Sequence, residues 1–291
     1  MRRRHVRRAA SALLLVGVGL TACNEEELEV AYLTVPSVAV APAGRPEADA
    51  IAAVRLVVDS LSLGFYPVPA EVPVLALGPR RVRLEPAVRR SGLGGEVVVY
   101  PLYEALTREL DLRASGVDTL RPIFGYVPGA VIGLEEGFES AATQFSRDLS
   151  PGGSAPLAMT TADPRDGTAA GLITLTPEAP VYEVASAVIR PGRASLLDLW
   201  VELDYRGEGI LAVALLPEDA GPAPAGTPPS ARYSQGALPR ETWTRFYFDI
   251  VDASNRDFVA EGFRVSLLAI YDAGLGARQE LFVDNLRVVY R

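Results

Sequence analysis

The run Leu197-Asp198-Leu199-Trp200-Val201-Glu202-Leu203-Asp204-Tyr205 alternates apolar residues with a second series that is mostly acidic. Successive side chains of a β-strand point to opposite faces, so the odd-numbered residues share one apolar face. Trp200 lies on the other face, among the carboxylates. This period of two predicts a half-buried strand rather than a helix, whose apolar residues recur every three or four positions.

Similar short runs, separated by turn residues, recur about every ten residues along most of the chain. In the C-terminal half they are 167–175, 181–189, 210–216, 243–250 and 263–271. In the N-terminal half they are 28–35, 52–63, 62–66, 72–77, 81–85, 96–100 and 123–127, and 103–112 is compatible with a short helix or a turn. This spacing predicts an all-β protein. We expect an Ig-like β-sandwich over 28–128, a hinge at 129–133 and an antiparallel jelly-roll β-sandwich over 134–291.

The N-terminus has the organisation of a signal peptide. Five arginines stand among the first eight residues, followed by the apolar run 13–20 and the small residues Thr21 and Ala22. This run is too short to span a bilayer, which takes about 20 apolar residues. We therefore expect residues 1–22 to be removed.

Leu20-Thr21-Ala22-Cys23 resembles the lipobox of bacterial lipoproteins. The resemblance implies that Cys23 is acylated and anchors the mature chain to a membrane; an ordinary secretory signal with a chance cysteine is the alternative. The acidic tether at 23–27 resembles the surface-export signal of Bacteroidota lipoproteins, although a solvated spacer would look the same. The expected location is the bacterial outer membrane, facing the cell exterior.

Composition limits the chemistry. All 28 basic residues are arginine, and loss of the five in the leader leaves 23 against 36 acidic residues, a net charge of −13. So acidic a chain is repelled by nucleic acid, which we exclude as a partner. The single histidine, His5, lies in the leader, and the single cysteine is Cys23. The mature chain therefore lacks the groups for Ser-His-Asp or Cys-His catalysis and for zinc sites built from His or Cys.

The first predicted sandwich carries Gly64-Phe65-Tyr66, a proline-rich element over 69–78, and Tyr100-Pro101-Leu102-Tyr103. These elements resemble those of Bacteroidota surface lipoproteins that have no assigned activity. The resemblance implies an organisation but no chemistry. We expect Tyr100 and Tyr103 to serve in packing rather than in binding.

The second predicted sandwich opens with Gly137-Phe138-Glu139 and closes with Val283-Asp284-Asn285. These motifs resemble the first and last strands of jelly-roll carbohydrate-binding modules and related galactose-binding-like domains, which pair with each other. The resemblance also implies a structural Ca²⁺ held by Glu139 and Asp284, the only cofactor we expect. As an alternative, Asp284 and Asn285 cap a turn or pair with an arginine.

Strand periodicity also places Trp243, Arg245 and Tyr247 on the polar face of their strand. Aromatic rings pack on the C–H face of a sugar, while charged groups hydrogen-bond its hydroxyls. We therefore predict a glycan-binding surface formed by Trp200, Glu202, Trp243, Arg245 and Tyr247. The alternative is that the two tryptophans cover core at a sheet edge or beneath the loop 217–236.

Three functions remain open from the sequence. The preferred one is a non-catalytic binder of a polysaccharide or another extracellular ligand. A structural or docking subunit, whose acidic surface meets a basic envelope protein, is the second. The third is a glycoside hydrolase, because Asp198, Glu202 and Asp204 resemble the E-x-D-x-E strand of jelly-roll glucanases. Trp200 replaces the middle acid of that pattern, which leaves only Glu202 and Asp204 as an acid and a base.

Overall fold

The computed structural model describes residues 29–41, 50–90, 95–192, 198–250 and 260–291. The predicted leader, Cys23 and the whole of the acidic tether lie outside these residues. The described chain is almost entirely strands, which confirms the all-β prediction. Its helical elements include the short 3₁₀ turns η3 (Pro229–Arg232) and η4 (Ala273–Leu275), and no helix in the described part is long and apolar enough to cross a bilayer.

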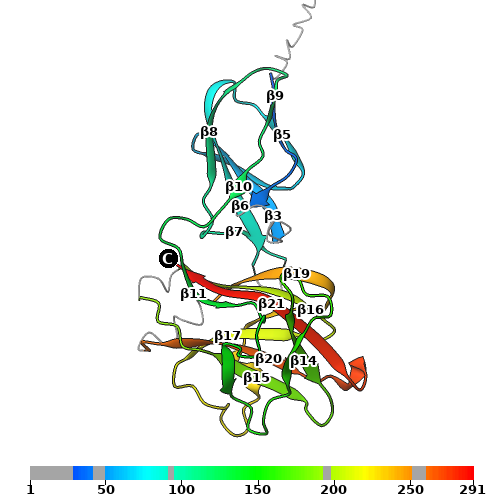
Figure 1. The fold of residues 1–291 in the computed structure, drawn as a ribbon. Helices are drawn as coiled ribbons and strands as arrows, with labels where there is room; N and C mark the ends of the chain where they lie inside the picture. Colours follow the sequence, from blue (N-terminus) through cyan, green and yellow to red (C-terminus); the bar gives the residue numbers. More distant parts are fainter. Residues whose placement is uncertain (1–28, 42–49, 91–94, 193–197, 251–259) are drawn as a thin grey trace, which may run out of the picture.

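The first ten strands form an N-terminal β-sandwich, the upper body in Figure 1. Sheet β5-β1-β9 faces sheet β4-β3-β6-β7, in which β8 also pairs with β6, and β2 pairs with β10. The strands are β1 (Ala31–Val35), β2 (Ala39–Val40), β3 (Ile51–Val58), β4 (Leu61–Pro67), β5 (Ala70–Val74), β6 (Gly78–Arg89), β7 (Val97–Val99), β8 (Leu106–Leu112), β9 (Val117–Thr119) and β10 (Ile123–Phe124).

Strand β8 occupies most of the segment that is compatible with a short helix in the sequence. It pairs antiparallel with β6 from Gly78 opposite Leu112 to Leu84 opposite Leu106. Leu112 is buried in the core between the two sheets. Tertiary pairing therefore decides the conformation of a segment whose local pattern is ambiguous.

The remaining strands form a C-terminal two-sheet sandwich. One sheet has the order β13-β14-β21-β16-β19, with β11 also on β21, and the other has the order β12-β15-β20-β17-β18. The strands are β11 (Val131–Glu136), β12 (Phe145–Asp148), β13 (Leu157–Thr160), β14 (Ala170–Leu175), β15 (Val181–Ser186), β16 (Leu199–Gly207), β17 (Leu211–Pro217), β18 (Gln235–Ala237), β19 (Arg240–Asp249), β20 (Phe263–Ile270) and β21 (Gln279–Tyr290). β11 pairs with β21, as predicted for the first and last strands.

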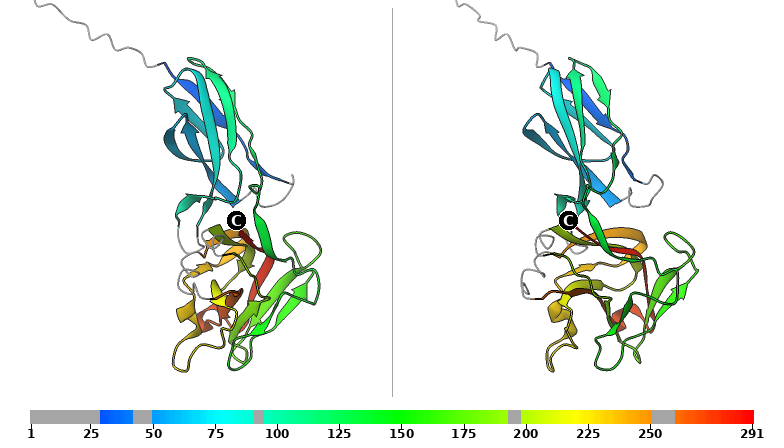
Figure 2. Two further views of the ribbon diagram at one scale, coloured as in Figure 1. Left: turned by 90° about the vertical axis from the view of Figure 1, so that its left-hand side faces the viewer. Right: turned by 60° about the vertical axis from the view of Figure 1, so that its left-hand side comes forward.

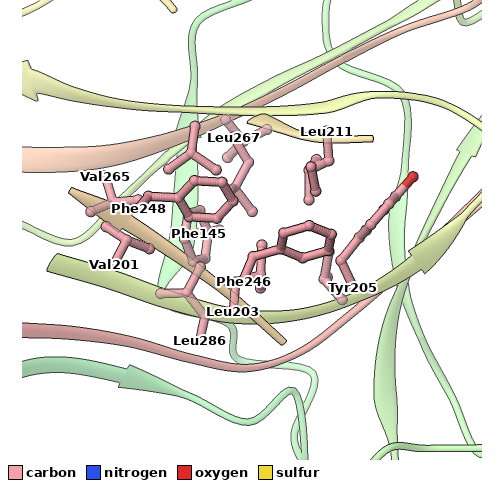
Figure 3. Packing of buried hydrophobic residues seen from close by; sticks show 14 of the residues in the cluster. Phe145, Val201, Leu203, Tyr205, Leu211, Phe246, Phe248, Val265, Leu267 and Leu286 are labelled. Atoms are coloured by element: carbon pink, nitrogen blue, oxygen red, sulfur yellow. The ribbon is translucent and has the colours of Figure 1, made fainter. Parts of the chain in front are cut away.

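The core of this sandwich contains the apolar face of the opening sequence run. Val201, Leu203 and Tyr205 of β16 point between the sheets, where they meet Phe246 and Phe248 of β19 (Figure 3). The two phenylalanine rings stack with centroids 6.0 Å apart. Burying a Val, Leu or Phe side chain contributes about 1.5–3 kcal/mol, so the apolar series of β16 is a substantial part of the driving force for folding.

A β-bulge interrupts β21 where it pairs with β16. Glu202 lies opposite Arg287, but Asp204 lies opposite Asp284, so β21 carries one extra residue. The extra residue is Asn285, which adopts the left-handed region with φ +48°. Asn tolerates this conformation better than most residues. The sequence motif Val283-Asp284-Asn285 therefore marks a bulge rather than a turn.

The two sandwiches are stacked end to end (Figures 1 and 2). Strand β7 lies at the lower end of the N-terminal sandwich, above the C-terminal one, and β6 contacts β19. Arg90, which follows β6, forms a β-bridge with Tyr247 of β19. The outer face of the sheet that carries β16 and β19 is therefore partly covered by the other sandwich.

Candidate functional site: a buried junction and an open cleft

The junction between the sandwiches contains four of the five residues predicted to form a glycan surface. Trp200, Glu202, Arg245 and Tyr247 are exposed by 4, 0, 6 and 1%. The Trp200 and Tyr247 rings lie 5.2 and 4.9 Å from the ring of Tyr100 in the N-terminal sandwich. The prediction of an open glycan surface at these four residues is therefore wrong, because the first sandwich covers that face.

A buried ionic network occupies the centre of the junction. Arg245 donates to Glu202 at 2.6 Å and to Asp204 at 3.0 Å. From the N-terminal sandwich, the hydroxyls of Tyr100 and Tyr126 both donate to Glu202, the second at 2.9 Å. Asn285 of the bulge adds a side-chain hydrogen bond to Asp204 at 3.0 Å. Two carboxylates and one guanidinium are thus taken out of water, which is costly unless most of their hydrogen bonds are made.

Burial fixes the protonation states within this network. Burial, and then the Glu202 carboxylate, raise the pKa values of Tyr100 and Tyr126, so both hydroxyls remain donors. Burial alone would lower the pKa of Arg245, but the Asp204 and Glu202 carboxylates outweigh it and raise the pKa. Arg245 therefore keeps its charge and stays paired. Glu202 and Asp204 are not placed to protonate a substrate or to activate water, which removes the basis of the hydrolase hypothesis.

Trp243 is the fifth predicted residue and lies away from the junction. It is half-buried, and its ring nitrogen donates to the Asp163 carbonyl at 2.9 Å. The guanidinium of Arg206 lies 5.5 Å from the Trp243 ring and 4.2 Å from the Phe282 ring. The structure thus separates Trp243 from Trp200, and the two tryptophans do not share a groove.

The predicted calcium ligands, Glu139 and Asp284, hold the two ends of one loop. Asp284 accepts backbone N–H bonds from Arg165 and Asp166 at 3.0 and 3.2 Å. Glu139 accepts from the backbone and hydroxyl of Thr168, which lower its pKa. Calcium requires six to eight oxygens, whereas this loop presents N–H donors to both carboxylates. The two residues do not fit a calcium site in this arrangement, and no cluster of three or more acidic, His or Cys ligands occurs in the described part of the chain.

An open cleft lies at one end of the C-terminal sandwich, around the β16–β17 turn. We call it the end cleft; it has two parts, which share Glu208 and Pro239. The charged part, of about 850 Å³, is lined by Arg206, Glu208, Arg240, Glu241, Arg278, Glu280 and Phe282, together with Gly207 and Pro239. Its three arginines are matched by three glutamates. This part therefore offers both donors and acceptors without a strong net charge.

The apolar part of the end cleft has a volume of about 490 Å³ and lies on the outer face of the second sheet. Ile210, Ile270 and Leu275 stand 44–51% exposed there. Tyr271 lies beside them and is fixed by a hydrogen bond from its hydroxyl to the Gly276 carbonyl at 2.8 Å. Asp272 lies at the rim and caps η4. An apolar floor bordered by carboxylates and guanidinium groups is a typical ligand-binding combination.

Sequence reasoning missed the end cleft for a physical reason. Its charged part is lined by residues from the ends of β16, β19 and β21 and from turns. At these positions strand periodicity does not predict the direction of a side chain. One signal was available. Glu280 and Phe282 follow the outward series of β21, and Phe282 lies opposite Arg206 in the pairing of β21 with β16.

No protein-family model and no curated protein sequence matches the chain. Among solved structures, it is similar to one described as the structural basis for the promiscuous specificity of carbohydrate-binding modules from the β-sandwich superfamily (11% identity, TM-score 0.34, 82% of this chain and 85% of that one). It is also similar to SGBP-B from a complex xyloglucan utilization locus in Bacteroides uniformis (10% identity, TM-score 0.32, 83% of this chain and 67% of that one). A third match is a Bacteroides uniformis β-glucuronidase (13% identity, TM-score 0.20), of which the aligned region spans 26%. Matches this distant say nothing about what this chain binds.

The junction network predicts a contrast between two neighbouring tyrosines. Tyr100→Phe removes a donor from the buried Glu202 carboxylate, and we expect the free energy of unfolding to fall by about 1–3 kcal/mol. Tyr103→Phe is the matched control, because the Tyr103 hydroxyl is buried without a hydrogen-bond partner in the described structure. Because that hydroxyl makes no bond that is lost, urea denaturation should find no fall in the free energy of unfolding of Tyr103→Phe. Equal losses in the two variants would contradict the role given to the Tyr100 hydroxyl.

Asp284 predicts a pH dependence of stability. Burial raises its pKa to about 6 against the opposing effect of its backbone N–H donors. The folded state then holds this proton more tightly than the unfolded state. The contribution of Asp284 to the free energy of unfolding is therefore largest below the unfolded pKa near about 4, and it is lost as the pH rises through about 6. We expect the stability of Asp284→Asn relative to the wild type to increase between pH 4 and pH 7 in urea unfolding. A difference that stays constant with pH would be inconsistent with this shift.

Proposed function

We propose that the chain is a non-catalytic glycan-binding lipoprotein of the bacterial outer membrane, which faces the cell exterior and binds its ligand in the end cleft. The observation that carries this proposal is the joining of an apolar floor to a charge-balanced polar part at the shared residues Glu208 and Pro239. A saccharide presents both kinds of surface, C–H faces and hydroxyl groups, within one ring.

Each part of the cleft offers a distinct kind of contact. Ile270 and Tyr271 are suited to pack against the C–H face of a pyranose. Glu208 is exposed between the two parts of the cleft and is suited to accept hydrogen bonds from sugar hydroxyls. Arg240 is suited to donate hydrogen bonds to the same kind of group. Because three glutamates balance three arginines, the charged part favours a neutral glycan over a strongly acidic one.

Binding without catalysis agrees with the inventory of the mature chain. Removal of the leader takes away His5, and acylation uses Cys23. The carboxylates that most resemble an acid–base pair, Glu202 and Asp204, are buried and bonded to Arg245. The location rests on the leader, the lipobox and the acidic tether at 23–27. Acyl chains contribute about 0.8 kcal/mol per buried methylene, so a multiply acylated Cys23 would hold the chain on a membrane.

A docking function is the second candidate. Ile210, Ile270 and Leu275 are unusually exposed for their size and are close enough to line one hollow. Exposed apolar clusters with a polar rim also mark protein interfaces. Retention on polysaccharide favours the glycan-binding function, whereas a stoichiometric protein partner recovered from solubilised membranes favours docking.

Binding should depend on the end cleft and not on the junction. We expect Glu208→Gln and Ile270→Ser each to raise the Kd for a retained polysaccharide by about tenfold, which corresponds to about 1.4 kcal/mol. Affinity electrophoresis across a panel of neutral and acidic polysaccharides would select the ligand, and isothermal titration would measure the Kd. Glu109→Gln, an exposed carboxylate on β8 of the other sandwich, is the control and should bind like the wild type. Unchanged binding in both cleft variants would refute the assignment.

A further inference from the structure

Three of the four most exposed large hydrophobic side chains in the described chain lie at one end of the N-terminal sandwich. Leu61, Leu75 and Val117 are 65, 66 and 62% exposed. We call them the apolar tip. Leu61 begins β4 directly after the β3–β4 turn, Leu75 follows β5, and Val117 begins β9. Each therefore belongs to a different strand connection.

Strand pairing shows that these three connections meet at the same end. Val74 at the end of β5 pairs with Ala31 at the start of β1, and the next residue of β1, Tyr32, pairs with Val117. A hollow of about 530 Å³ is lined by residues from two of the connections, among them Leu61 and Leu75. This end is opposite to the junction, where β6 ends beside Tyr247.

The chain enters the sandwich at this same end. The carbonyl of Val30, just before β1, accepts from the backbone of Ser115 at 2.7 Å, and Tyr32 donates to the carbonyl of Gly116 at 2.8 Å. Glu29, the first described residue, is six residues after Cys23. An extended chain spans at most about 3.6 Å per residue, so an acylated Cys23 would hold the tip within about 22 Å of the membrane.

Charges around the tip are compatible with a lipid surface. Asp59 in the β3–β4 turn is paired with Arg80 at 3.2 Å and accepts from the backbone of Arg81. Arg113 in the β8–β9 connection is 80% exposed and pairs with the exposed Asp111 at 3.4 Å. The Asp59 carboxylate, two residues before Leu61, is thus compensated, and the accessible Arg113 guanidinium is suited to reach lipid phosphates.

We propose that the apolar tip docks onto the lipid bilayer that holds Cys23, with Leu61, Leu75 and Val117 in the headgroup region. The inference rests on the lipid anchor of the proposed function. The bilayer is the expected occupant because the short tether and the exposed side chains leave the sandwich at the same end. With the tip on the membrane, the C-terminal sandwich lies farthest from it (Figure 2).

A single fluorophore can test this docking, since acylation leaves the mature chain with no other thiol. Leu75→Cys would be labelled with a polarity-sensitive dye in the lipidated protein reconstituted into phosphatidylcholine vesicles, with Met159→Cys in the C-terminal sandwich as the exposed control. We expect the label at position 75 to shift to shorter wavelength and to be quenched at least twofold by nitroxide-labelled lipid. The label at position 159 should remain aqueous.

Failure of the anchor and failure of the docking give different results. If the lipidated protein does not float with vesicles, or floats equally well as Cys23→Ser, both the anchor and the docking are overturned. If it floats only when acylated but the label at position 75 stays aqueous, the docking alone is overturned. A blue shift that needs no vesicles and grows with protein concentration would assign the tip to a second copy of the chain and would also overturn the bilayer.

Discussion

The Arg245 guanidinium, held between the Glu202 and Asp204 carboxylates, is the interaction on which the arrangement of the two sandwiches depends. A charge buried this deeply is tolerable only where partners surround it. The C-terminal sandwich supplies Asp204 and Asn285, but the free oxygens of Glu202 require hydroxyls from Tyr100 and Tyr126. Separating the sandwiches would expose the Glu202 and Arg245 side chains to water or leave Glu202 without its two tyrosine donors. The N-terminal sandwich is therefore part of the environment that supplies the hydrogen bonds of this ion pair.

This constraint divides one sheet face into two regions. Toward the N-terminal sandwich, the outer face of β16 and β19 is closed by aromatic rings and by the buried ion pair. Beyond it, Arg206 and Phe282 continue the same face into the end cleft, which is open. The region of the sheet with the densest aromatic and acidic side chains is thus buried between the sandwiches, and the open part of this face is the end cleft.

The sequence predicted the strands well and their environment poorly. Alternation in β16 correctly placed Val201, Leu203 and Tyr205 in the core, because the apolar face of a strand is specified by local pattern. The same alternation could not show what covers Trp200, because its neighbour Tyr100 is a hundred residues away in the chain. The Val283-Asp284-Asn285 motif lies in the last strand, as predicted. Its physical meaning, a bulge that turns Asn285 toward Asp204, depends on the pairing with β16.

Strand β6 gives the molecule a mechanical property. Its twelve residues run from the tip of the N-terminal sandwich to the junction, about 40 Å at 3.3 Å per residue, and the chain then bridges to Tyr247. If the end cleft holds a polymer and Cys23 anchors the chain, as proposed, a pull on the polymer would reach the anchored end through this strand and the buried ion pair. Forced separation is governed by the rate of unfolding rather than by equilibrium stability. The tyrosine donors at the junction would then set how long the protein withstands a pull from outside the cell.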